Sequence, residues 1–183
     1  DHMKRLNILV TGGAGFIGSH LVNKLIDLDH NVTIVDNFSS GSAHNLNKKS
    51  YFIEGDLSDK STIKKIPNNI NVVFHLAAQV SNEASYKDPS LDLKANVFST
   101  LLLLEWAKTT NVQNFVFTST MGVYQDSLGY AVVEDSPKLP RGFYGINKLA
   151  CEEYIRIFSE EGMKTNILRL FNVYGPGQNM NDL

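Results

Sequence analysis

A tyrosine and a lysine stand four residues apart in the stretch GFYGINKLACEEY, at Tyr144 and Lys148. Residues at i and i+4 share one face of a helix, so the ammonium of Lys148 can lie close to the phenol of Tyr144. A fixed positive charge favours the phenolate and lowers the pKa of tyrosine from its usual value of ~10. Such a tyrosine could take a proton from a hydroxyl group or return one. The Tyr-x-x-x-Lys pattern by itself is common and is most often helix surface, so its meaning depends on its neighbours.

Three hydroxyl side chains end an apolar run in the stretch FVFTSTMGVY. Thr118, Ser119 and Thr120 follow a predicted buried strand, and ligands bind beyond the carboxyl ends of strands in doubly wound sheets. We therefore expect Thr120 to touch the substrate, with Ser119 beside it. Met121 and Gly122 come next, and neither of them can carry a proton.

Three glycines separate the first apolar run from an amphipathic segment in TGGAGFIGSHLVNKL. Gly12, Gly15 and Gly18 have a spacing of three and three, whereas the ordinary dinucleotide fingerprint has two and three. Small residues let the backbone approach a pyrophosphate, and the helix start offers unpaired N–H groups and a positive dipole end. Asp36, after the second strand, can accept hydrogen bonds from both ribose hydroxyls and would repel a 2′-phosphate. Asn37 follows rather than an arginine, so the sequence predicts NAD in preference to NADP.

Short β-branched runs alternate with longer helix-compatible segments, which is typical of βαβ units. Several strands are continuously hydrophobic and should be buried on both sides. We predict an α/β fold with a doubly wound (Rossmann) parallel sheet and helices on both faces. The predicted strands cover residues 7–10, 32–35, 51–54, 72–76, 114–117 and 166–170, and the predicted helices cover 17–28, 42–48, 61–66, 90–109 and 143–160. Residues 125–142 are expected to form a loop, either a lid or a plain surface excursion.

Charge and composition narrow the functional class. A net charge of -2, with 43% hydrophobic and 20% charged residues, predicts a globular protein without a nucleic-acid or membrane surface. The apolar runs are far shorter than the ~20 residues of a membrane span, and no export signal opens the chain. The single cysteine, Cys151, fits a reducing compartment, so we expect a cytoplasmic protein. No cluster has metal-ligand spacing, and Asp1–Met3 is expected to be an expression scar.

The order of these motifs resembles the extended short-chain dehydrogenase/reductase family, within it the nucleotide-sugar epimerase/dehydratase group that includes UDP-glucose 4-epimerase. The matching stretches are TGGAGFIGSHL, VDNFSSG, GDL, VFHLAAQ, NVFST, TSTMGVY, YGINK and LRLFNVYGPG, which together run from Ile8 to Gly177. This order and spacing is highly specific for the family. It implies an NAD-dependent enzyme that acts on a nucleotide sugar.

The resemblance also implies roles for individual residues. The expected cofactor contacts, with Gly12, Gly15 and Gly18, are Phe16, Ile17, Asp36, Asn37, Asp56, Leu57, Leu76, Ala77, Ala78, Asn96, Tyr144, Lys148 and Phe171. Tyr144, Lys148, Thr120 and, secondarily, Ser119 would be catalytic. Thr120 and Tyr144 would also contact the sugar, and Asn172 would meet the nucleotide-sugar phosphates.

Plainer explanations stay open for some residues. Asn96 could be a satisfied buried amide, and Phe171 is by composition as easily core as cofactor contact. His75 is expected to be structural rather than catalytic. Cys151 is expected to pack in the core.

The chain departs from the family pattern in two places. Asn147 precedes the lysine where Ser or Thr is often found, which we expect to be tolerated. The chain also stops soon after NVYGPG, where family members continue into elements that complete the substrate site. We therefore expect residues 4–183 to be an NAD-binding Rossmann domain, truncated before the substrate-binding region is complete.

Met121 and Gly122 narrow the reaction further. Dehydratases of the family have an Asp-Glu pair at these two positions, and decarboxylases usually have a glutamate at the second. We therefore predict a UDP-sugar 4-epimerase that works through a transient 4-keto sugar. A dehydrogenase or ketosugar reductase is the alternative, followed by a regulator that binds dinucleotide without turnover. The resemblance also implies a homodimer formed by helices 90–109 and 143–160, although the same patterns fit burial within one chain.

Overall fold

A computed structural model describes residues 4–125 and 131–178 of the chain. One parallel sheet has the strand order β3-β2-β1-β4-β5-β6. The strands are β1 (Asn7–Thr11), β2 (Asn31–Asp36), β3 (Tyr51–Glu54), β4 (Val72–His75), β5 (Asn114–Thr120) and β6 (Thr165–Leu170). The order reverses direction between β1 and β4, and a crevice for ligands forms at the carboxyl ends of such strands. The predicted doubly wound fold is confirmed.

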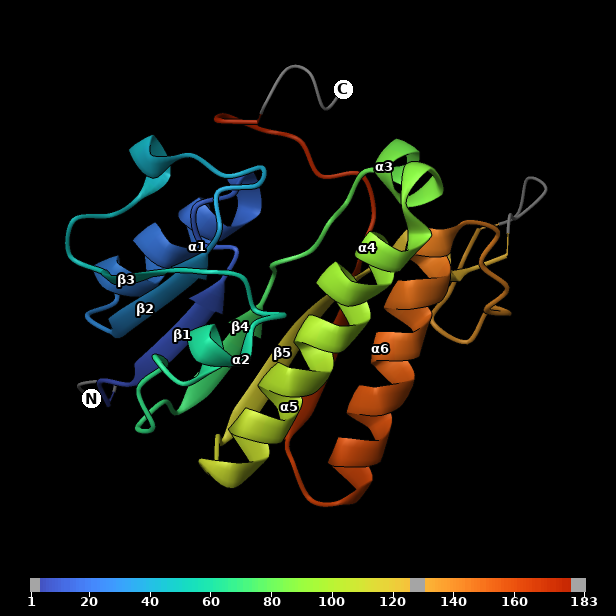
Figure 1. Ribbon diagram of the computed structural model, residues 1–183. Helices are drawn as coiled ribbons and strands as arrows, with labels where there is room; N and C mark the ends of the chain where they lie inside the picture. Colours follow the sequence, from blue (N-terminus) through green and yellow to red (C-terminus); the bar gives the residue numbers. More distant parts are fainter. Residues whose placement is uncertain (1–3, 126–130, 179–183) are drawn as a thin grey trace.

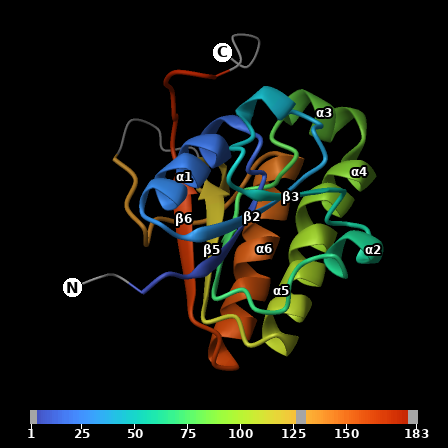
Figure 2. The same ribbon diagram turned by 90° about the vertical axis from the view of Figure 1, so that its left-hand side faces the viewer.

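Helices cover both faces of this sheet. They are α1 (Phe16–Asp27), α2 (Lys60–Ile63), α3 (Asn82–Lys87), α4 (Pro89–Leu93), α5 (Ser99–Thr109) and α6 (Phe143–Glu160), with short turns η1 (Ala43–Asn45), η2 (Lys94–Phe98) and η3 (Met121–Val123). Figure 1 shows α5 and α6 running side by side against the sheet, and Figure 2 shows α1 on the opposite face. The segment from β4 to α3 and the segment after β6 both run toward the upper end of Figure 1.

Two hydrophobic clusters, one on each face, explain the continuous apolar runs of the strands. Ile8 and Val10 of β1 pack in the cluster beneath α1, whereas Leu9 between them packs in the cluster beneath α5 and α6. Side chains alternate along a strand, so a strand covered on both faces must be apolar at successive positions. Cys151 lies fully buried in the second cluster, as expected.

The long helix predicted over residues 90–109 is in fact three segments. Helix α4 begins at Pro89 with the Asp88 carboxylate as its cap, and a π-helical turn, η2, separates it from α5. The Ser99 hydroxyl donates to the carbonyl of Ala95 (2.6 Å), and the Thr100 hydroxyl donates to that of Asn96 (2.6 Å). Hydroxyls of this kind take carbonyls away from the helical ladder, and π turns are frequent at functional sites.

Other predicted boundaries also moved. The helix predicted over 42–48 is only the turn η1, and β5 continues to Thr120, three residues beyond its predicted end. Helix α3 was not predicted at all, because its short NEASYK sequence carries no apolar periodicity.

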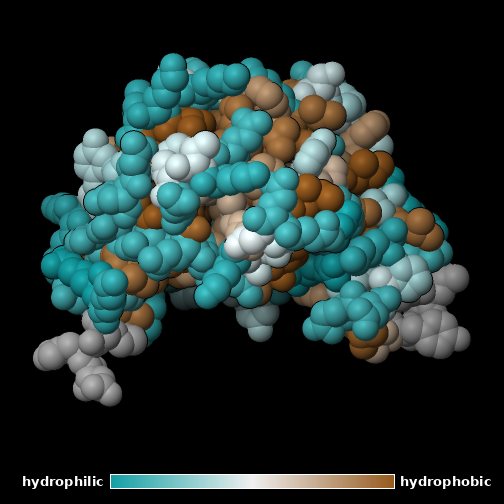
Figure 3. All heavy atoms as spheres, turned by 90° about the horizontal axis from the view of Figure 1, so that it is seen from below, coloured by the Kyte–Doolittle hydropathy of each residue, from teal (hydrophilic) through white to brown (hydrophobic). Residues whose placement is uncertain are grey.

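The end of the molecule opposite the carboxyl edge of the sheet presents mostly hydrophilic side chains, interrupted by hydrophobic ones (Figure 3). Within residues 4–125 and 131–178, no helix is long and apolar enough to cross a membrane. The predicted scar, Asp1–Met3, lies outside the described residues.

Candidate active site

The turn after β1 is shaped by two close approaches of backbone to backbone. Gly12 has φ +71°, and a Cβ there would lie 2.8 Å from the nitrogen of Ala77. A Cβ on Gly18 would collide with the carbonyl oxygen of Gly12. The turn is closed by the N–H of Gly15, which donates to the carbonyl of Gly12 (3.1 Å). Glycine is therefore required at Gly12 and Gly18 for steric reasons.

Helix α1 starts in this turn without a side-chain cap. Gly15 occupies the N-cap position of this 12-residue helix, and no side chain accepts from its first N–H groups. Unpaired N–H groups at the positive end of a helix are suited to a phosphate. The narrow glycine turn, whose space a Cβ would fill, lies directly before the start of a helix whose first N–H groups have no side-chain cap. Together these two features fit the pyrophosphate of a dinucleotide.

Asp36 ties this turn to the next loop. Its carboxylate accepts from the N–H of Ala14 (3.0 Å) and from the N–H of Phe38 (2.8 Å), and the residue is buried. A carboxylate offers about four lone-pair sites, so capacity remains for ribose hydroxyls. Asn37 and Asp56 each cap a local turn with the side-chain oxygen, and Leu57 packs in the core.

A chain of hydrogen bonds fixes the segment after β4. The N–H groups of Leu76 and Ala77 both donate to the hydroxyl oxygen of Thr11 (3.1 Å each), so its proton is free for Nδ1 of His75 (2.7 Å). His75 must then carry its own proton on Nε2, which donates to Thr100 (2.9 Å). Burial, and secondarily the charge of Lys148, lowers the pKa of His75 to about 3. This neutral, fully paired histidine agrees with the structural role expected for it.

Asn96, on the π turn η2, is a satisfied buried amide that also holds the loop after β4. Its side chain accepts from the N–H of Gln79 (3.0 Å) and donates to the carbonyl of Gln79 (3.1 Å). Its amide also donates to Asp92 (3.0 Å), a buried carboxylate that sequence reasoning missed. The available signal was an acidic residue within an apolar helical segment, four positions before Asn96.

Helix α6 brings Tyr144 and Lys148 to the carboxyl edge of β5. Lys148 is buried, with Nζ 4.2 Å from the ring centroid of Phe117 and 5.9 Å from that of Tyr144. Burial lowers the pKa of Lys148 to about 8, against the opposing effects of Cys151, Glu152 and Asp92.

The expected lowering of the tyrosine pKa is wrong for this structure. Burial, with smaller contributions from Asp92 and Cys151, raises the pKa of Tyr144 to about 12. The i, i+4 spacing does bring the lysine near the ring, but loss of hydration disfavours the phenolate more than the ammonium stabilises it.

Thr120 and Ser119 point into different surroundings. The Thr120 hydroxyl oxygen caps the turn η3 by accepting from the N–H of Gly122 (3.1 Å), at the edge next to α6. The Ser119 hydroxyl is buried and donates to Glu152 (2.6 Å), which Arg169 holds through two bonds of 2.9 Å and 2.8 Å. Successive side chains of a strand face opposite ways, so Ser119 does not accompany Thr120. The hydroxyl of Ser119 is therefore committed to Glu152 rather than offered to a ligand beside Thr120.

The segment after β6 passes the start of α1. Phe171 and Asn172 are exposed there, so within residues 4–125 and 131–178 Phe171 does not pack in the core. The carbonyl of Pro176 lies 2.8 Å from Nε2 of His20 on α1.

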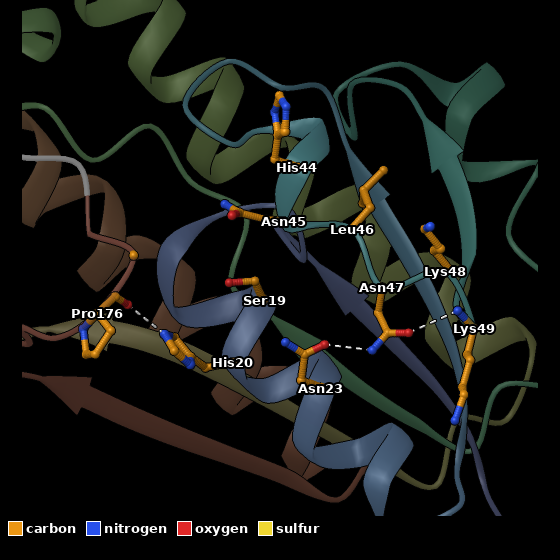
Figure 4. A pocket seen from close by; sticks show the side chains of 11 residues that line it. Ser19, His20, Asn23, His44, Asn45, Leu46, Asn47, Lys48, Lys49 and Pro176 are labelled. Atoms are coloured by element: carbon orange, nitrogen blue, oxygen red, sulfur yellow. Dashed lines mark hydrogen bonds between the residues drawn. The ribbon is translucent and has the colours of Figure 1, made fainter.

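An open groove of about 610 Å³ lies beside α1 (Figure 4). Its lining residues are Ser19, His20, Asn23, His44, Asn45, Leu46, Asn47, Lys48, Lys49, Pro176 and Gly177. None of these was predicted as a site residue. Within the described part of the chain, no group of three His, Cys, Asp or Glu side chains could hold a metal ion.

Comparison with known proteins gives one matching family and many similar structures. Residues 8–183 match the NAD dependent epimerase/dehydratase family. The UDP-glucose 4-epimerase of Thermotoga maritima, solved with UDP-glucose, is 42% identical with a TM-score of 0.92, over 95% of this chain and 58% of that one. The Thermus thermophilus UDP-glucose 4-epimerase, solved with NAD, is 37% identical with a TM-score of 0.91, over 95% and 58%.

A UDP-N-acetylglucosamine 4-epimerase from Methanobrevibacter ruminantium, in complex with UDP-N-acetylmuramic acid, is 40% identical with a TM-score of 0.92, over 98% of this chain and 59% of that one. The chain spans 54% to 58% of the length of curated UDP-glucose 4-epimerases that it matches.

Proposed function

This chain belongs to the NAD dependent epimerase/dehydratase family, and we propose that it is the cofactor-binding part of a UDP-sugar 4-epimerase. The observation that carries the proposal is the arrangement at the end of β5, where Thr120 lies beside the α6 helix of Tyr144 and Lys148. The next two residues, Met121 and Gly122, offer no acid or base for the elimination that a dehydratase requires.

The glycine turn and α1 would hold NAD. Gly12, Gly15 and Gly18 leave space for the pyrophosphate, with Phe16 and Ile17 donating through their N–H groups. Asp36, Asn37, Asp56 and Leu57 would border the adenosine, while Leu76, Ala77, Ala78, Asn96 and Phe171 would border the remainder. A bound NAD would supply the hydride chemistry, namely oxidation of the sugar carbon and its reduction on the other face.

Proton transfer falls to the residues of β5 and α6. Thr120 would hydrogen-bond the C4 hydroxyl and align it with the phenol oxygen of Tyr144. Tyr144 would take the hydroxyl proton as the carbon is oxidised and return it when the keto group is reduced. The ammonium of Lys148 would stabilise the phenolate and, with Tyr144, bond the nicotinamide ribose. Asn172 would meet the nucleotide-sugar phosphates.

The relatives support a UDP-sugar as substrate. Two of the similar structures are UDP-sugar 4-epimerases solved with UDP-linked molecules, one of them an N-acetylated sugar enzyme. We therefore propose UDP-hexoses as the substrate class. Elements beyond residues 4–183 would complete the sugar pocket, because the chain spans little more than half of its relatives.

A homodimer through α4 and α6 is part of the proposal. Ile146, Tyr154 and Ile157 are exposed along α6, and Leu91 is exposed on the neighbouring α4. Apolar side chains at 146, 154 and 157 lie on one helical face, which a second copy of the chain would cover. The lone buried thiol supports the cytoplasm as the compartment.

Turnover in deuterium oxide tests the reaction. The full-length protein is incubated with candidate UDP-sugars and NAD, and products are followed by NMR. We expect the 4-epimer to form without net NADH and without deuterium on carbon, because the hydride never leaves the site. Accumulation of a 4-keto-6-deoxy sugar would mean a dehydratase, and stoichiometric NADH would mean a dehydrogenase. Either result would overturn the proposal.

A further inference from the structure

Asp92 is a buried carboxylate, with a relative exposure of 1%, on α4, which packs against α6. Its charge acts on both Tyr144 and Lys148. One oxygen accepts from the amides of Gln79 and Asn96 (3.0 Å each), and the other accepts from the amide of Asn147 (2.6 Å). All of these donors are neutral. The carboxylate is thus held by hydrogen bonds, but none of these partners neutralises its charge. Burying a charge in this state is costly unless a cation lies near.

The bond to Asn147 joins α4 to α6 at the turn that carries the lysine. Asn147 directly precedes Lys148, and the two bonded residues are 55 positions apart in the chain. This contact gives a reason for asparagine at the position where Ser or Thr was expected. An amide reaches farther than a hydroxyl and can bridge to a carboxylate on the neighbouring helix.

Three acidic groups raise the pKa of Lys148, in the order Cys151, Glu152 and Asp92. Asp92 differs from the other two because its hydrogen-bond donors are all neutral side chains, and burial raises its own pKa. Glu152, one turn along α6, is already paired with Arg169 by two hydrogen bonds. His75 of β4 is neutral, because burial lowers its pKa to about 3. The pKa of the Cys151 thiol is raised by burial, and that of the Tyr144 phenol is raised to about 12, so both are protonated at neutral pH.

We propose that Asp92 is a positioning residue for the catalytic pair: its charge keeps Lys148 protonated in the buried site, and its bond to Asn147 sets where α6 presents Lys148. The catalytic meaning of this inference rests on the proposed function. The electrostatic part does not, and it can be measured without substrate or cofactor.

The first test is a titration of Lys148 by NMR. The full-length protein is labelled with ¹³C-lysine, and the Lys148 signal is assigned with Lys148→Arg. In Asp92→Asn, which keeps the shape of the side chain, the pKa of Lys148 should fall by roughly one to two units, as expected when a nearby charge is removed at an effective dielectric constant of about 20. Asp88→Asn is the matched control, because it removes an exposed carboxylate that caps the same helix and leaves an amide that can still cap.

Unchanged titration of Lys148 in Asp92→Asn would overturn the inference. Should that variant not fold, Lys148→Met tests the same coupling from the other side. Removal of the ammonium should raise the pKa of Asp92, measured on its ¹³C-carboxyl signal, by the same amount, because the coupling between two sites is reciprocal. An Asp92 signal that titrates as in the wild type would equally overturn it.

The pH profile of turnover tests the link to catalysis. Both limbs of the kcat profile should move to lower pH in Asp92→Asn, because the lost anion favoured the protonated forms of Lys148 and Tyr144. Asn147→Ala should lower kcat several-fold without moving either limb, since the charge of Asp92 remains. A kcat loss in Asp92→Asn that is uniform across pH would mean a merely structural role and would overturn the inference. If the wild type turned over no UDP-sugar but Lys148 still responded in the titration, the proposed function would fall and the electrostatic role of Asp92 would stand.

Discussion

The phenol of Tyr144 lies in a buried environment that raises its pKa to about 12. Tyr144 is therefore protonated in this structure, and the charges of bound cofactor and substrate would set its pKa during the reaction. Positive charge brought near the ring when the site is filled, in addition to that of Lys148, would favour the proposed proton transfer.

Replacement of Tyr144 by phenylalanine should lower turnover far more than cofactor affinity, because the variant loses its proton carrier but only one of the many proposed NAD contacts. The ring packing is kept and only the proton-carrying oxygen is lost, so we expect kcat to fall by about 10²-fold to 10⁴-fold. Steady-state kinetics and calorimetric titration with NAD measure the two quantities. A variant that kept wild-type turnover would remove Tyr144 from the chemistry and favour a regulatory protein.

Thr120 and Ser119, neighbours on β5, should respond differently to mutation. Thr120→Val keeps the shape but loses the hydroxyl proposed to bond substrate, so kcat should fall about 10-fold to 100-fold. The free energy of unfolding should fall by about 0.5–1 kcal/mol, because the cap to the N–H of Gly122 is lost as well. Ser119→Ala loses the buried bond to Glu152, so the free energy of unfolding should fall by about 1–3 kcal/mol with kcat largely kept. Chemical denaturation and steady-state kinetics on both variants measure these effects. A large kcat loss in Ser119→Ala but not in Thr120→Val would mean that Ser119, rather than Thr120, contacts the substrate.

Helix α6 approaches the turn η3 so closely that one glycine is indispensable. A Cβ on Gly145 would collide with the carbonyl of Gly122, whereas a Cβ on Gly142 would meet only the Tyr86 side chain, at 3.7 Å. Tyr144 sits between these two glycines. The close contact therefore sets the distance from the phenol to the end of β5.

The substitution Gly145→Ala should push the start of α6 away from η3. We expect a stability loss of about 1–3 kcal/mol, typical of overpacking, together with a loss of turnover. Gly142→Ala, three residues earlier at the N-cap, is the control and should cost less. Its Cβ has room, its backbone is extended (φ -119°), and alanine lowers the entropy of the unfolded chain. Thermal unfolding and kinetics compare the two, and equal behaviour of both variants would contradict the steric explanation.

The free energy of unfolding should decrease as the pH is lowered into the acid range, because His75 is buried in its neutral form. Its pKa is about 3 in the folded chain and ~6.5 when unfolded. Between these values the unfolded chain binds the extra proton, so stability is lost as pH falls from ~6.5 toward 3, by at most ~1.4 kcal/mol per pH unit. Urea unfolding at pH 7, 6 and 5 measures the slope. His75→Gln should be less stable at pH 7 but show a shallower slope, and an unchanged slope would mean that other groups cause it.

The assembly of the protein should depend on the exposed apolar face of α6. Ile157→Glu places a charge on that face and should shift a dimer to monomer, as seen by sedimentation velocity. Glu153→Gln, on the same helix and paired with Arg156 at the surface, should leave the assembly unchanged. A wild-type protein that sediments as a monomer would remove this part of the proposed function.

The sequence by itself determined the features that are local in the chain. The glycine turn, the Tyr144–Lys148 spacing and the apolar strands were all predictable, because turn geometry, helical periodicity and strand burial act over a few residues. The family resemblance added the positions that are expected to bind cofactor and substrate. The break at η2 was not predicted, because the bonds from Ser99 and Thr100 to helical carbonyls, and those between Asn96 and Gln79, form only as these side chains become buried.

Only the tertiary structure decided which of these side chains are available to a ligand and which protonation state each one has. The commitment of Ser119 to Glu152, 33 residues away, and the bond from Asn147 to Asp92, 55 residues away, arise only when strands and helices pack. The raised pKa of Tyr144 has the same origin, because desolvation depends on everything that surrounds a group. Spacing in the chain placed the phenol near the ammonium, and burial in the fold set the proton affinity of both.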